Sequence, residues 1–408
     1  MNRIFTIIMV VFPAFAAAQT PMTLSDCLRT ALERNLTLRS GQIAILRSED
    51  LQKTSFDLAP VELTFGQDFT TGLSTDNSVR INQTFDLPSV YSSKSKLLKA
   101  QTEVERGRMA VTRNQLAANV KSAYFTLAFM RERLRILQSQ DSLYAHFLRI
   151  ANAKLGAGET GRLEQMNIER LAGENRTAVA NAVRDVHTAQ LQLMLWMNTD
   201  SAVTTVGDTL QRLDIGVPGT FDAASTPMGT ALQNEVTAAG RNLHSVKQGW
   251  MPQVSVGATF QAVIRGLNPY NIDRTPFSKG DFMGFEVGVS LPLSFGAQRA
   301  KVRAAKREVE MAELNRQEQL RSLQTDYQTA MDSYAKARRT LDYYDREALH
   351  KADEMVRISR TSYENGSISY VELLQNMQTA EETRMSYVQA INDCNQTVIQ
   401  LECLKGNE

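Results

Sequence analysis

Apolar residues recur at alternating steps of four and three along two long stretches of the chain. The first stretch begins at Leu116 and ends at Leu155, with one interruption at Asp141. The second begins at Leu320 and ends at Ile358. A repeat of 3.5 residues that lasts for several heptads is typical of helices that coil against neighbouring helices. We therefore expect one very long helix in each half of the chain.

Proline and glycine positions agree with this prediction. No proline lies between Pro88 and Pro218 or after Pro292, and a proline inside a helix costs about 3 kcal/mol. Each long helix meets a glycine-containing break, near residues 156–161 in the first half and 364–369 in the second. Because helical periodicity resumes after each break, we expect two helical hairpins with their turns at these positions.

Four shorter segments alternate apolar and polar residues with a period of two. We expect strands over about 61–71, 78–87, 253–264 and 283–293. Each has the length of a tilted strand that crosses a bilayer. A sheet packed on a soluble core would show the same alternation, but here one face is uniformly polar or small. We therefore interpret these strands as part of a transmembrane β-barrel.

The strand count sets a condition on this barrel. The smallest transmembrane barrels have eight strands, so four cannot close one and several copies of the chain must contribute. Arg80, Asp86 and Glu286 lie on the polar faces of the expected strands, and we expect them to face the lumen. The apolar faces would then contact outer-membrane lipid.

The start of the chain has the pattern of an export signal. A short basic start is followed by an apolar run and by Ala16-Ala17-Ala18, so we expect residues 1–18 to be a signal peptide. A membrane anchor is the alternative, but the run is too short to span comfortably and Pro13 interrupts it.

The order helix, two strands, long helix, turn and helix occurs twice. Leu87-Pro88 recurs as Leu291-Pro292, and the spacing of about 205 residues indicates a duplication of half the chain rather than a solenoid. We expect a first repeat over residues 19–198, a linker over 199–222 and a second repeat over 223–408.

Composition excludes several classes of function. Lys and Arg number 45 against 44 Asp and Glu, which argues against a nucleic-acid partner. Three cysteines and four scattered histidines have no metal-ligand spacing, so we expect no metal, no cofactor and no enzymatic activity. Cys27, Cys394 and Cys403 are expected to be reduced core residues, although a Cys27–Cys403 bridge is conceivable.

The organisation of the chain resembles the TolC-like outer-membrane efflux proteins. The likeness rests on the helix 23–35 after the signal, on 291–296 after the last strand, on 363–375 at the second turn, and on their order in a duplicated chain. The resemblance implies a mainly α-helical homotrimer, with a twelve-stranded transmembrane barrel in the outer membrane and a coiled-coil α-barrel that continues through the periplasm.

The same resemblance implies the function and the partners. Such a trimer is the passive exit duct of a tripartite efflux pump or a type I secretion system, and it works with a periplasmic adaptor and an inner-membrane transporter. Two alternatives remain. A periplasmic adaptor also has a long hairpin, and a secreted structural protein can be a coiled coil. Neither class of protein is expected to combine two hairpins, four membrane-length strands and a half-chain duplication.

The resemblance also implies a periplasmic gate. In the family, acidic residues six and nine positions after the second turn glycine narrow the tip; here Glu372 and Gln375 occupy those positions. An aromatic residue three positions before that glycine bonds an acid of the neighbouring hairpin, and Tyr363 and Glu164 are the matching pair. The family's basic partner is absent, because Ile368 stands in its place. Glu372 could instead only cap its own helix, and Tyr363 could only pack at a helix end.

The surface on which an adaptor would dock follows from the same comparison. Leu155, Gly158 and Gly366 lie at the two expected turns, and the resemblance implies that they form this docking tip.

Overall fold

We describe the protein from a computed structural model. It describes residues 20–68, 76–158, 161–206, 210–215, 220–261 and 282–406. The expected signal peptide, both connections between paired strands, and the strand ends at 69–71 and 262–264 lie outside these residues, as do parts of the linker and of the first turn.

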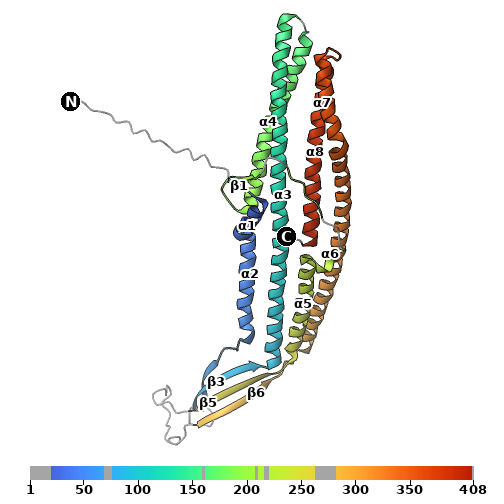
Figure 1. The fold of residues 1–408 in the computed structure, drawn as a ribbon. Helices are drawn as coiled ribbons and strands as arrows, with labels where there is room; N and C mark the ends of the chain where they lie inside the picture. The colour runs from blue at the N-terminus through green and yellow to red at the C-terminus, as the bar shows by residue number, and fades with distance from the viewer. Residues whose placement is uncertain are drawn as a thin grey trace, which may run out of the picture. The chain divides into compact units, whose positions relative to one another are not determined.

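The described residues of the first half form four α-helices. They are α1 (Leu24–Arg34), α2 (Leu36–Gln52), α3 (Pro88–Ala157) and α4 (Arg162–Met197), and a 3-10 turn, η1 (Lys53–Phe56), follows α2. Pro88 opens α3 at a position where a missing N–H costs nothing. The 70 residues of α3 make a helix about 105 Å long at 1.5 Å per residue. Together, α3 and α4 form the first hairpin (Figure 1).

The second half repeats this order, but it has one α-helix before its long strands where the first half has two, and its hairpin contains a π turn. Its helices are α5 (Pro227–Lys247), α6 (Phe295–Tyr343), α7 (Leu349–Glu364) and α8 (Tyr370–Lys405), with 3-10 turns η2 (Ala223–Ser225) and η3 (Gln248–Trp250). A π-helical turn, η5 (Tyr344–Ala348), lies between α6 and α7. The matching part of the first hairpin is the continuous helix α3.

The π turn displaces the buried face of the second hairpin by one position. The heptad pattern predicts Ile358 on the buried seam, but its side chain is 50% exposed, whereas Ala352 and Ser359 are 3% and 4% exposed. A π turn inserts one residue into a helix, so each apolar position after it moves to the next residue. The predicted seam is therefore wrong beyond Ala348.

The long strands form one antiparallel sheet. They are β2 (Glu62–Asp68), β3 (Asp76–Asp86), β5 (Gln253–Gln261) and β6 (Phe282–Ser290), in the order β2-β3-β5-β6. The two sequence halves therefore meet at the β3–β5 ladder, in which Asn82 is opposite Gly257. A separate short parallel pair joins β1 (Thr20–Met22) to β4 (Val203–Thr205), which periodicity did not predict.

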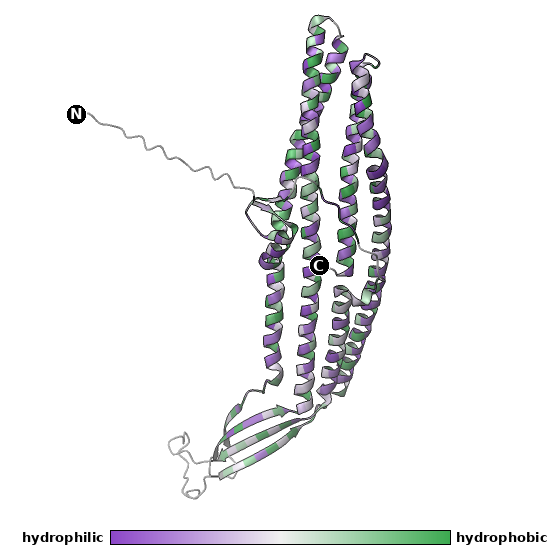
Figure 2. Cartoon of the chain, in the orientation of Figure 1, coloured by the Kyte–Doolittle hydropathy of each residue, from purple (hydrophilic) through white to green (hydrophobic). Residues whose placement is uncertain are grey.

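The register gives the sheet two different faces. Leu63, Ile81, Ala258 and Phe285 are cross-strand neighbours on one face. On the other face, glycine, hydroxyl, amide and charged residues align, and Figure 2 shows the alternating bands along the strands. The apolar face is open in this chain, and Phe285 is 78% exposed.

The chain divides into two compact units that each draw on both sequence halves. One comprises Met1–Arg39, Val111–Thr226 and Ser322–Glu408, and the other comprises Ser40–Ala110 and Pro227–Arg321. The first contains the ends of both hairpins, and the second contains the sheet with α2 and α5. Among the described helices, none combines the length and the hydropathy that a membrane span requires.

The cysteines are not bridged. Cys27 and Cys394 are buried, Cys403 is half-buried, and all three are free thiols. Cys27 lies in the core where α1 packs against α3 and α4, beside Val120 and Leu193. Burial raises the pKa of its thiol to about 11, which makes it unreactive at neutral pH.

Candidate functional site

Both hairpin turns are built around a glycine with a positive φ. Gly158 has φ +75° and Gly366 has φ +69°, a left-handed conformation that only glycine adopts without strain. The N–H of Gly158 donates to the carbonyl of Leu155, and that of Gly366 donates to the carbonyl of Tyr363. An open space lies where a Cβ would stand on either glycine. The backbone of both glycines is therefore exposed.

Glu372 completes a capping box at the start of α8. Its carboxylate accepts a hydrogen bond from the backbone N–H of Ser369 at 2.7 Å, and the Ser369 hydroxyl accepts one from the N–H of Glu372 at 3.2 Å. The donated N–H lowers the pKa of the Glu372 carboxyl below 4.5. Its side chain is exposed, as is that of Gln375 one turn further on. Glu372 is thus ionised and held on its own helix.

Tyr363 links the two hairpins within one chain. Its hydroxyl accepts a hydrogen bond from the Lys154 ammonium at 2.9 Å. Its ring meets the ring of Tyr370 edge-on, with the centroids 5.7 Å apart. The Lys154 contact was not predicted from the sequence, because the residue that reaches Tyr363 lies 209 positions away. The pairing of Tyr363 with Glu164 stays a prediction.

A small apolar core fixes these side chains. Tyr370 is buried against Phe147 at 5.7 Å between ring centroids, and Ile168 and Leu373 pack beside it. Burial is the main cause that raises the pKa of the Tyr370 hydroxyl, and the nearby Tyr363 and Glu164 raise this pKa further. That hydroxyl has no hydrogen-bond partner among the described residues. Both hairpin ends therefore share one hydrophobic cluster.

Apolar side chains flank the turns on the outside. Leu155 is half-buried, whereas three residues in the first turns of α4 and α8 are exposed. They are Leu163, Met166 and Val371. The sequence carried a signal for them, since each is apolar and lies within five residues of the end of an expected turn, but the heptad pattern did not include them.

The polar face of the sheet carries an ion pair across two strands. Arg80 on β3 and Glu286 on β6 approach to 3.7 Å, and between them lies Gly257 on β5. A Cβ at Gly257 would stand 3.2 Å from the carbonyl oxygen of Ile81 on β3, so the glycine suits the close approach of the two strands here. Asp86 accepts a hydrogen bond from Gln253 at 2.8 Å. These charges line one exposed face.

The described residues include no cluster of His, Cys, Asp or Glu that could hold a metal ion. The site is instead a set of exposed charges and aromatic contacts, placed on the hairpin ends and on one face of the sheet.

Comparisons with known proteins find a family model that matches part of the chain and solved structures that share its fold. The model of the family described as "Outer membrane efflux protein" matches residues 230–407. No curated protein matches the chain.

Several solved structures share the fold over nearly the whole chain. A membrane protein from Pseudomonas aeruginosa superposes with a TM-score of 0.79 at 15% identity, covering 94% of this chain and 91% of that one. The CmeC outer membrane channel of Campylobacter jejuni gives 0.74 at 13% identity, with 94% and 86% covered. The MtrE outer membrane channel of Neisseria gonorrhoeae, solved in its open state, gives 0.75 at 16% identity, with 94% and 88% covered.

Proposed function

We propose that this chain, whose residues 230–407 match the outer membrane efflux protein family, forms the passive exit duct of a tripartite efflux pump or a type I secretion system. It would sit in the outer membrane and extend into the periplasm. No catalytic group or cofactor takes part in this function, because a duct requires only a polar lumen and a means of closing it.

The observation that carries the proposal is the two-faced sheet with open edges. Among the described strands, β2 and β6 each pair on one side only, so both edges are available to another copy of the chain. Unpaired edges do not occur in lipid. Three copies would supply twelve strands, as in the trimers of the family. The apolar face would then contact lipid, and Arg80, Asp86 and Glu286 would line the lumen.

The hairpin ends are proposed as the periplasmic gate. Around a threefold axis, three copies of Glu372 would gather negative charge and attract cations, whereas Gln375 adds none. The Lys154–Tyr363 hydrogen bond ties the two hairpin ends of one chain together. Glu164 is proposed to meet Tyr363 of a neighbouring hairpin, as the family pattern implies.

The tip is proposed as the docking surface for a periplasmic adaptor, which in turn contacts an inner-membrane transporter. Gly158 and Gly366 present exposed backbone at the turns, and the half-buried Leu155 lies three residues before Gly158. The exposed Leu163 and Val371 beside them would give an apolar contact for the end of an adaptor hairpin.

Purification from the outer membrane followed by planar-bilayer recording tests the proposal. The mature protein should migrate as a heat-modifiable trimer on a gel and should form discrete ion-conducting channels. A chain recovered as a soluble monomer that never conducts would contradict the proposal and would favour a secreted coiled-coil protein.

A further inference from the structure

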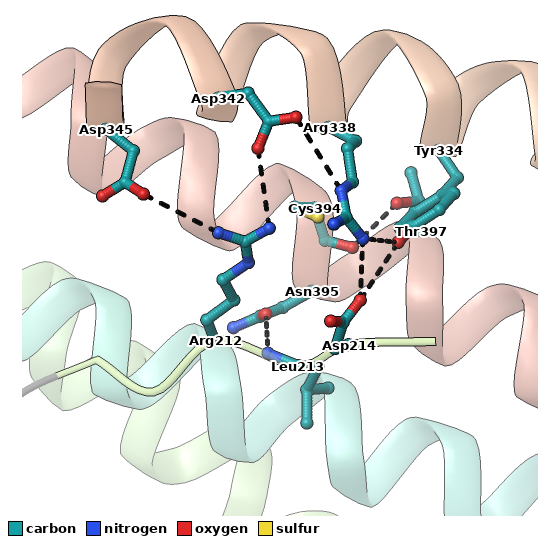
Figure 3. A network of polar contacts seen from close by, with 10 residues as sticks. All are labelled: Arg212, Leu213, Asp214, Tyr334, Arg338, Asp342, Asp345, Cys394, Asn395 and Thr397. Carbon is teal, nitrogen blue, oxygen red and sulfur yellow. Dashed lines mark hydrogen bonds and ion pairs between the residues drawn. The ribbon is translucent and has the colours of Figure 1, made fainter. Parts of the chain in front are cut away.

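An extended segment of the linker is held along its backbone by α8. We name this segment, Leu210–Ile215, the strap (Figure 3). Asn395 is fully buried, and its side-chain amide donates to the carbonyl of Gln211 at 2.8 Å. Its side-chain oxygen accepts from the N–H of Leu213, also at 2.8 Å. The Asn395 amide therefore bonds the backbone carbonyl just before Arg212 and the backbone N–H just after it.

Two charged side chains of the strap bind α6 and the π turn. Arg212 lies 3.7 Å from Asp342 and 4.0 Å from Asp345. Asp214 lies 2.8 Å from Arg338, which also approaches Asp342 at 3.9 Å. Figure 3 shows that the contacts connect acidic and basic side chains in turn, in the order Asp345, Arg212, Asp342, Arg338 and Asp214. Such a network holds its members more firmly than an isolated surface pair does.

The strap is attached where the helix is irregular. Asp342 precedes the π turn, and Asp345 lies within it. The Tyr387 hydroxyl of α8 also donates to Asp345, at 3.2 Å. A single carboxylate in the turn therefore joins the strap to α8. Helices bend at π turns because the regular hydrogen-bond ladder is interrupted there.

The hairpin end lies far from the π turn, so a small bend at the turn would displace the hairpin end by several ångströms. Tyr363 lies seventeen residues beyond Arg346, the centre of the turn, which is about 26 Å along the helix. A bend of about 10° would displace Tyr363 by roughly 4 to 5 Å at that distance. This displacement exceeds what the 2.9 Å hydrogen bond to Lys154 tolerates.

We propose that the π turn is the hinge on which the end of α7 moves, and that Arg212 is a positioning residue that holds this hinge in the arrangement seen here. The inference rests on the proposed function, because it assigns the pivot of the proposed gate. Loosening the strap would let α7 bend and separate Tyr363 from Lys154.

Three variants test the hinge by suppression. Arg212→Ala loosens the strap, and Asp345→Asn does so while keeping the side-chain shape. Deletion of Arg346, which is exposed, removes the extra residue and restores a continuous α-helix. Arg29→Ala is the control, because it removes an arginine–aspartate pair at 2.8 Å on α1. Each is recorded as the full-length protein in planar bilayers.

The hinge predicts a specific pattern. Arg212→Ala and Asp345→Asn should raise the mean conductance by roughly twofold or more, through a shift toward the bent state. Arg29→Ala should leave it unchanged. Combining Arg212→Ala with the deletion should return it to the wild-type value, because a continuous helix cannot bend there. A double variant that conducts as much as Arg212→Ala alone, or an Arg212→Ala channel like the wild type, would overturn the hinge.

A second measurement separates the hinge from the channel function. Spin labels at Asn167 on α4 and Arg360 on α7, with the three native cysteines replaced by alanine, report the separation of the hairpin ends without any conductance. The distance distribution should broaden in Arg212→Ala and narrow again when Arg346 is deleted as well. Unchanged distributions would refute the hinge even if channels form, and the expected change in a protein that never conducts would refute only the duct.

Discussion

At the scale of single residues, the end of each hairpin is fixed by a few polar contacts. Glu372 is bound by the N–H of Ser369 at 2.7 Å, and Lys154 is bound by Tyr363 at 2.9 Å. Each contact joins a charged group to a neutral partner, a class of hydrogen bond stronger than the neutral kind. Their removal should therefore be measurable.

The cap at Glu372 makes the start of α8 sensitive to acid. In the folded protein, the hydrogen bond from the Ser369 N–H lowers the pKa of Glu372 below its ordinary value of 4.5. A lowered pKa stabilises the fold above the unfolded-state value, and this stabilisation disappears as the pH falls through the folded-state value. We expect amide protection in the first turn of α8 to decrease below pH 4.5, as measured by hydrogen exchange corrected for intrinsic rates.

Glu372→Gln isolates this effect, because a glutamine can accept the same hydrogen bond without titrating. Its protection should not depend on pH in this range. Glu382→Gln, which replaces an exposed carboxylate later on α8, should behave as the wild type does. An equal acid-dependent loss in Glu372→Gln would show that another group is responsible.

The Lys154–Tyr363 contact should act as one unit. Lys154→Met and Tyr363→Phe each remove one partner, and each should increase the conductance of the resting channel. The double variant should show less than the sum of the two single effects, since both changes remove the same hydrogen bond. Lys154→Arg keeps a donor and should stay close to the wild type. Fully additive effects in bilayer recordings would mean that the two residues act separately.

At the scale of elements, close helix packing depends on one small residue. A Cβ at Gly107 of α3 would stand 3.0 Å from the Cα of Ala231 on α5. Gly107→Val should therefore destabilise this unit by about 1 to 3 kcal/mol through overpacking. Gly173→Ala on α4 is the matched control, because nothing lies within 4 Å of its added Cβ. It should stabilise its helix by roughly 0.5 to 1 kcal/mol.

Thermal unfolding followed by circular dichroism compares the two glycine variants. Gly107→Val should unfold at a lower temperature than the wild type, and Gly173→Ala at an equal or higher one. A Gly107→Val protein as stable as the wild type would mean that α3 and α5 can separate without cost.

The elements themselves were predictable because their signals are local. Period-two alternation places the strand β6 at Phe282–Ser290 against an expected 283–293, and Gly158 and Gly366 mark both turns. The π turn was not predicted, since the apolar pattern around it is that of a continuous helix and Asp345 in the turn contacts residues distant in sequence, Arg212 and Tyr387. For the same reason, the contacts of Lys154 and Asn395 were not predicted, because their partners lie 209 and more than 180 residues away.

At the scale of the whole molecule, the charges on the polar face should set ion selectivity. The described side chains there include three carboxylates, Glu62, Asp86 and Glu286, and one guanidinium, Arg80. This excess of negative charge predicts a preference for cations. Glu286→Gln should lower the cation-to-anion permeability ratio and Arg80→Gln should raise it, as measured by reversal potentials. Shifts in the same direction would place these residues outside the conduction path.

The proposed duct requires that the sheet separate lipid from water. Single cysteines at successive positions of β6 test it most directly, in outer membranes that hold a protein without native cysteines. A cysteine at Glu286 or Ser290 should react with a charged, water-soluble maleimide, whereas one at Phe285, Val287 or Val289 should react only with a lipid-soluble reagent. Rapid reaction of all five positions with the charged reagent would contradict the account, because it would leave no side of the sheet in hydrocarbon.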